Sequence, residues 1–274
     1  MRYRLFCQLT GVALAVLSLV CVASAGDDPA DFVTKHLDSI GTPETRLANT
    51  LRTGKGTATL DVVSGGAGHM QGTSMVASLG KQFNFLMYFN AGTYNGEQFK
   101  FDGKKTLIAD NSVDRRENLA SFMYRHDVIL KEGLWGGVWN SGWPLNDLKA
   151  KNAELKFERT KKVDGKQLLE YLYRPKHSER ELVIHLFFDP ETYRHVRTEY
   201  DDRGTYGELV ALSVTEKFSD FRDEKGLMLA HSWAISYEPG QVGTSIMNWK
   251  VELNDVRVTT ASAAVGAAPN TEKK

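Results

Sequence analysis

The sequence predicts a mainly β protein: an antiparallel sheet of about eleven strands that curls, with a few helices packed into its concave face. Three observations lead to this prediction. Short segments typical of strands recur from Thr57 to Ala109 and resume from Glu154 onward. Turn pairs such as Asn95-Gly96, Asp102-Gly103 and Asp164-Gly165 separate the apolar runs. Helical spacing is confined to the N-terminus and to a central segment.

The first 25 residues have the composition of a secretory signal peptide. Two arginines precede an apolar stretch from Leu5 to Val22, and Ala23-Ser24-Ala25 supplies the small residues of a cleavage site near Gly26. Both cysteines lie in this segment, so the mature chain has no thiol for disulfides, catalysis or metal binding. We expect a protein that works outside the cytoplasm. One alternative is an uncleaved membrane anchor, which the cleavage signature disfavours. The other is lipidation of Cys21, which Val20 directly before the cysteine disfavours.

Composition restricts the partners of the mature chain. The 34 basic and 34 acidic side chains lose Arg2 and Arg4 with the signal peptide, which leaves 32 against 34, a net charge of −2. A chain so close to neutral has no electrostatic footprint for nucleic acid. We expect a single domain over residues 26–258 and a disordered tail at 259–274.

The N-terminal half begins with two expected helices. The first starts at Pro29 and ends before Gly41, and the second starts at Pro43 and runs through Leu51 to end by Gly54. Residues 64–73 are Gly-rich and are expected to form a loop. The strands predicted around this loop form an antiparallel meander and cover residues 57–63, 83–89, 98–101 and 106–109.

Residues 112–150 interrupt the strand pattern. Asp114 can cap a helix that Gly133 ends, and an irregular segment with Trp135, Trp139 and Trp143 follows. This insert is either ordinary core or a lid over the concave face of the sheet. Strands resume after it, at residues 154–160, 167–174, 180–188, 193–200, 208–219, 227–238 and 244–258.

Catalytic motifs are missing from the sequence. The histidines do not have metal-ligand spacing, and there is no nucleophile elbow or phosphate-binding loop. We therefore expect neither an enzyme nor a metal or cofactor. The apolar residues favour a cavity for a long apolar ligand, with walls from the sheet and from the insert. The candidate lining residues are Phe83, Phe85, Phe99, Phe101, Phe122, Ile129, Trp135, Trp139 and Trp143.

Several segments resemble the LolA-like superfamily of periplasmic lipoprotein carriers and lipoprotein-sorting proteins. They are the opening helix pair with Phe32 to Gly41, Leu47 and Leu51; the hairpin with Tyr94-Asn95-Gly96-Glu97 and Phe101 to Lys105; the Asp189-Pro190-Glu191-Thr192 turn within Phe188 to Arg197; and Phe218 to His231, where Ala230 stands in place of a common proline. These motifs form turns and strands, and none is catalytic.

The resemblance implies a strongly curved, unclosed antiparallel sheet of about eleven strands, a half-barrel that holds helices on its concave face and shields acyl chains between sheet and helices. It implies a periplasmic carrier of lipid acyl chains or acylated lipoproteins, with a possible partner protein in the inner or outer membrane. An envelope stress sensor or protein-interaction module with the same fold is the alternative.

Overall fold

The computed structural model describes residues 29–48, 51–63, 68–92, 94–110, 118–177, 181–204, 212–240 and 245–259. The expected signal peptide, the helix cap at Asp114 and the C-terminal tail lie outside the described residues. None of the helices within these ranges is both long and apolar enough to cross a membrane.

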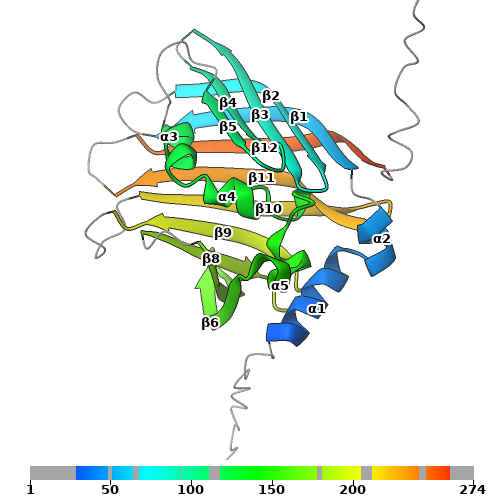
Figure 1. Ribbon diagram of the computed structural model, residues 1–274. Coiled ribbons are helices and arrows are strands. Elements are labelled where there is room, and N and C mark those ends of the chain that lie inside the picture. The colour runs from blue at the N-terminus through cyan, green and yellow to red at the C-terminus, as the bar shows by residue number, and fades with distance from the viewer. Residues whose placement is uncertain are drawn as a thin grey trace, which may run out of the picture.

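The described chain forms one twelve-stranded antiparallel sheet with helices packed on one of its faces (Figure 1). The helices are α1 (Pro29–Ile40), α2 (Pro43–Ala48), α3 (Asn118–Arg125), α4 (Val128–Glu132) and α5 (Leu148–Lys151), with short 3-10 turns η1 (Gly137–Trp139) and η2 (Pro144–Asn146). The strands are β1 (Leu51–Val62), β2 (Gly68–Leu79), β3 (Gln82–Ala91), β4 (Tyr94–Phe101), β5 (Thr106–Asp110), β6 (Glu154–Val163), β7 (Lys166–Arg174), β8 (Leu182–Phe188), β9 (His195–Asp202), β10 (Leu212–Glu224), β11 (Leu227–Pro239) and β12 (Met247–Thr259).

The strand order places the chain's first and last strands together in the middle of the sheet. The order is β5-β4-β3-β2-β1-β12-β11-β10-β9-β8-β7-β6, and β1 pairs with β12 along its whole length. The two edge strands are therefore β5 and β6, which follow each other in sequence. The connection between them must travel from one edge of the sheet to the other. It carries α3, α4, η1, η2 and α5, which is why these elements lie across one face.

The predicted loop at residues 64–73 and the predicted second helix differ from the structure in their described residues. Residues 68–73, expected in a loop, belong to strand β2, so the sheet has twelve strands. Strand β2 has a glycine at position 72 where a strand would usually carry a larger side chain. A Cβ there would lie 2.1 Å from the Tyr88 carbonyl oxygen on β3. The second helix ends at Ala48 and Leu51 begins β1, so its predicted extension toward Gly54 is wrong.

The helix expected to end at Gly133 is two helices within the described residues. They are separated at His126 and Asp127, where His126 Nε2 lies 3.2 Å from the buried Asp202 carboxylate of β9. Gly133 ends α4 with a φ of 78°, as predicted for a left-handed C-cap. The prediction of the antiparallel meander β3–β4–β5 is confirmed.

Candidate functional site

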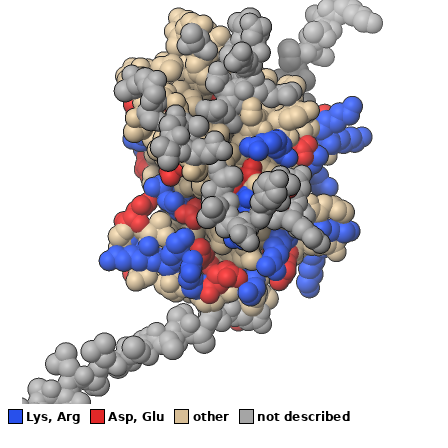
Figure 2. Space-filling model, turned by 90° about the vertical axis from the view of Figure 1, so that its left-hand side faces the viewer, with Lys and Arg blue, Asp and Glu red and all other residues tan. Residues whose placement is uncertain are grey.

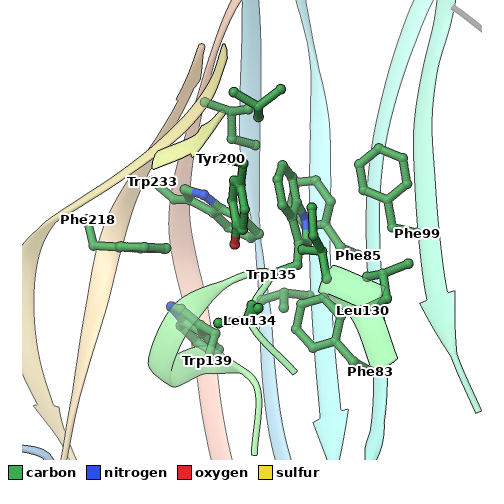
Figure 3. Packing of buried hydrophobic residues seen from close by; sticks show 14 of the residues in the cluster. Phe83, Phe85, Phe99, Leu130, Leu134, Trp135, Trp139, Tyr200, Phe218 and Trp233 are labelled. Atoms are coloured by element: carbon green, nitrogen blue, oxygen red, sulfur yellow. The ribbon is translucent and has the colours of Figure 1, made fainter. Parts of the chain in front are cut away.

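The segment between α4 and α5, residues 134–147, is here called the Trp-rich segment, and its residues 134–140 and 143–145 are buried in the apolar interior. Trp135 is fully buried at its centre (Figure 3). Its ring centroid lies 5.5 Å from that of Phe99 on β4 and 6.3 Å from that of Phe85 on β3. On the other side it lies 5.7 Å from Trp233 of β11 and 6.2 Å from Tyr200 of β9. One indole therefore contacts aromatic rings from both halves of the sheet.

Trp139 packs where β1 has no side chain. A Cβ at Gly54 would lie 3.1 Å from the Trp139 ring, 3.0 Å from Val76 and 3.2 Å from Leu253. Glycine in the middle of this strand thus leaves room for the indole. The Trp139 Nε1 donates to the Ala230 carbonyl oxygen on β11 at 2.7 Å, which fixes the orientation of the ring.

Trp143 connects the Trp-rich segment to α1. Its Nε1 donates to His36 Nε2 at 3.0 Å, and the other ring nitrogen of His36 lies 2.9 Å from the Tyr193 carbonyl oxygen. These two bonds suit a neutral imidazole that accepts at Nε2 and donates at Nδ1. Burial lowers the pKa of His36 to about 4, so the ring is neutral near pH 7. Trp143 also packs on His195 at 4.7 Å between ring centroids.

Polar side chains of the sheet hold the backbone of the Trp-rich segment. Gly136 N–H donates to the Glu216 carboxyl of β10 at 2.8 Å, and Arg52 of β1 donates to the Val138 carbonyl oxygen. Ser141 N–H donates to Ser78 Oγ of β2 at 2.7 Å, and the two hydroxyl oxygens lie 2.6 Å apart. The segment is therefore attached to strands on both sides of the central β1–β12 pair.

Glu216 is a fully buried carboxyl in apolar surroundings. Its second oxygen accepts from the Tyr200 hydroxyl at 2.7 Å. Burial raises the pKa of Glu216 to about 8, since an ionised carboxylate loses its hydration there. The same cause lowers the pKa of the buried Arg52 guanidinium to about 10. These groups give an otherwise apolar interior a small set of specific polar contacts.

The predicted lining residues all lie in the buried core, and none is more than 9% exposed. The structure brings Phe85, Phe99 and Trp135 into direct contact. Phe101 and Trp143 also border a surface pocket, and Phe101 and Phe83 border another. Phe122 and Ile129 lie on α3 and α4 and are completely buried.

Sequence reasoning missed the polar contacts of the Trp-rich segment. Glu216 lies between Val214 and Phe218 on β10, all three of which are buried, so the alternation places this carboxyl on the inner face. Arg52 lies two residues from Gly54 on the buried side of β1. A charged residue at an inward position of a strand was the available signal.

Figure 2 shows Lys and Arg interspersed with Asp and Glu on one face of the molecule. Among the described residues, no group of three or more His, Cys, Asp or Glu side chains is placed to hold a metal ion.

Fold and site together define a mainly antiparallel β protein whose apolar interior is occupied by a tryptophan-rich connection. No family model matches the chain, and no curated protein matches it in sequence. Among solved structures, it is similar to a DUF1329 family protein from Desulfovibrio piger, with 14% identity, a TM-score of 0.49, and 84% of this chain and 92% of that chain covered. It is also similar to a LolA superfamily protein from Nitrosomonas europaea, with 14% identity, a TM-score of 0.47, and 87% and 97% covered.

Proposed function

We propose that this protein is a periplasmic carrier that binds the acyl chains of a lipid or an acylated protein in the space filled by the Trp-rich segment. The observation that carries the proposal is the position of Trp135, which separates aromatic rings of β4 and β9. Removal of this segment would expose a continuous apolar wall. The resemblance of the sequence to LolA-like carriers implies the same function.

We infer that the sheet around this space is a strongly curved half-barrel. Phe99 and Tyr200 lie within 5.5 and 6.2 Å of the Trp135 ring centroid, although seven steps in the strand order separate β4 from β9. Seven strand spacings in a flat sheet would cover about 34 Å. Strong curvature of the sheet accounts for the difference between this span and the short distances from Trp135 to both rings.

The energetics favour a ligand with more than one acyl chain. A buried indole removes about 150–250 Å² from water, so exposing Trp135, Trp139 and Trp143 together costs roughly 15 kcal/mol. Each buried methylene contributes about 0.8 kcal/mol, so a single chain of about 14 methylenes falls short of this cost while two chains exceed it. Partial repacking of the indoles against the ligand would lower the number of methylenes that the ligand must bury.

Lipid analysis of the purified protein tests this proposal. Native mass spectrometry should detect co-purified lipid, or the delipidated protein should take up a diacyl lipid. Brominated acyl chains should then quench tryptophan emission, because the bromine atoms would lie against the indoles. Absence of both co-purified lipid and quenching by any acylated probe would refute the proposal.

A further inference from the structure

A pocket of about 510 Å³ lies beside the Trp-rich segment. One part of its wall is apolar and consists of Phe101 at the end of β4, Leu130 of α4 and Trp143. Trp143 also faces the interior, where it packs on His195. The pocket therefore adjoins the apolar interior, since Phe101, Leu130 and Trp143 belong both to its wall and to the buried core. Its volume lies in the range of roughly 300–1,000 Å³ that is common for small-molecule sites.

Three lysines from three separate elements border the same pocket. Lys81 lies in the turn between β2 and β3, Lys131 lies on α4 and Lys151 ends α5. Lys131 pairs with Asp127 at 2.6 Å, and Lys151 donates to the Glu132 carbonyl oxygen at 2.7 Å and lies 3.9 Å from the Glu132 carboxylate.

Lys81 supplies positive charge that is not neutralised locally. Within the described parts of the chain it has no ion-pair partner. The pKa of the Lys151 ammonium is lowered mainly by burial; the Glu132 and Asp147 carboxylates oppose this shift, and the positive charge of Lys81 adds to it. These two ammonium groups are therefore close enough to repel each other. Asp147 also borders the pocket, but its carboxylate caps α5 by accepting from Ala150 N–H at 3.0 Å.

Close backbone packing fixes the pocket wall between the lysines. Gly133 has a φ of 78°, and a Cβ there would lie 2.3 Å from the Gly142 carbonyl oxygen. Only glycine allows the end of α4 to rest against the Trp-rich segment at this distance. Lys131 and Trp143 are thereby held on neighbouring parts of one wall.

We propose that this pocket binds the head group of an anionic amphiphile, with a phosphate or carboxylate between Lys81 and Lys151 and the start of its alkyl chain against Phe101, Leu130 and Trp143. This inference rests on the proposed carrier function and names the ligand class. The lysines supply the charge complementarity, and the apolar wall supplies the contact for the chain. An anion between the two ammonium groups would also remove their mutual repulsion.

Binding of three amphiphiles with the same chain tests the head-group preference. Dodecyl phosphate, dodecyltrimethylammonium and dodecyl maltoside are titrated below their micelle concentrations, with inorganic phosphate as the head group alone. We expect dodecyl phosphate to bind about tenfold or more tightly than the other two amphiphiles. Inorganic phosphate should bind far more weakly than dodecyl phosphate, since it lacks the apolar contact.

Charge-removing variants locate the preference in this pocket. Lys81→Gln together with Lys151→Gln should abolish the preference for phosphate and leave binding of dodecyl maltoside unchanged. Lys81→Gln alone alters only an exposed turn and should remove part of the preference for phosphate. It replaces the double variant in this test if that variant folds poorly. Lys162→Gln, an exposed lysine of β6, is the matched control and should have no effect.

The possible outcomes separate this inference from the carrier function. Equal binding of all three amphiphiles, or a preference that survives both lysine variants, would overturn the inference and leave the carrier function intact. Inorganic phosphate binding as tightly as dodecyl phosphate would overturn the amphiphile assignment. No binding of any amphiphile or diacyl lipid would overturn both.

Discussion

A disulfide between Ser78→Cys and Ser141→Cys should hold the Trp-rich segment on the sheet and prevent acyl-chain binding. The two hydroxyl oxygens lie 2.6 Å apart, close to the S–S length of about 2.05 Å that a disulfide requires. Both native cysteines lie within residues 1–25, so a chain that begins at Gly26 contains only the introduced pair.

The expected stabilisation follows from the sequence separation of 63 residues between these positions. Loop-closure entropy for a loop of this length gives about 4 kcal/mol in the free energy of unfolding. The same cross-link would oppose every motion that removes Trp143 and its neighbours from the interior. We therefore expect the oxidised protein to unfold at higher urea concentration and to lose binding of a fluorescent diacyl lipid.

Reduction of the same sample provides the control. Dithiothreitol should restore lipid binding at once, because only the cross-link differs between the two states. Each single cysteine variant should bind lipid whether oxidant is present or not. If the oxidised double variant binds lipid as tightly as the reduced one, the Trp-rich segment does not need to move and the proposed binding space is wrong.

Three further variants test separate parts of the structure. Ser78→Ala removes the hydroxyl that Ser141 contacts, so it should lower stability by about 1–2 kcal/mol and raise lipid affinity. The control variant Ser236→Ala should lower stability and leave lipid affinity unchanged. Urea titration measures the first quantity and lipid titration the second. Glu216→Gln should flatten the pH dependence of stability. Burial raises the pKa of Glu216 from 4.5 to about 8, so the folded wild-type chain retains a proton that the unfolded chain releases. The stability of the wild type therefore falls as the pH rises between these two pKa values. A wild-type profile without that fall, measured by urea titration between pH 5 and 8, would contradict this pKa. Gly54→Ala should cost about 1–3 kcal/mol, because its Cβ would press on Val76, Trp139 and Leu253, and Gly92→Ala, with open space around it, should cost little by the same urea assay.

Strand alternation and turn pairs were sufficient to predict most of the fold. They indicate β3, β4 and β5 and the strands after residue 154, because each inner face repeats with a period of two. They fail for β2 and for the start of β1, where glycines replace apolar residues. The reasons are nonlocal: Gly72 faces the β3 backbone, and Gly54 faces the Trp139 ring.

The candidate site could be predicted only in its apolar part. The clustering of Trp135, Trp139 and Trp143 in one irregular segment indicated an unusual interior. It could not tell which strands these rings contact, since that depends on the connection from edge strand β5 to edge strand β6. Glu216 and Arg52 were missed because a charged residue within a strand is ordinarily assigned to the solvent face.

The Trp-rich segment combines two properties that a removable core element needs. Within the described residues, no strand pair of the sheet includes residues 134–147, so their displacement leaves every ladder intact. The hydrogen bonds that the segment makes with Glu216, Arg52 and Ser78 set the cost of displacement, and a ligand made of acyl chains cannot replace them. The apolar contacts of the indoles differ, because acyl chains restore them. In the proposed carrier function, the affinity would therefore depend on how much apolar surface the ligand brings beyond that of the tryptophans, and lipids with several chains would bind in preference to those with one.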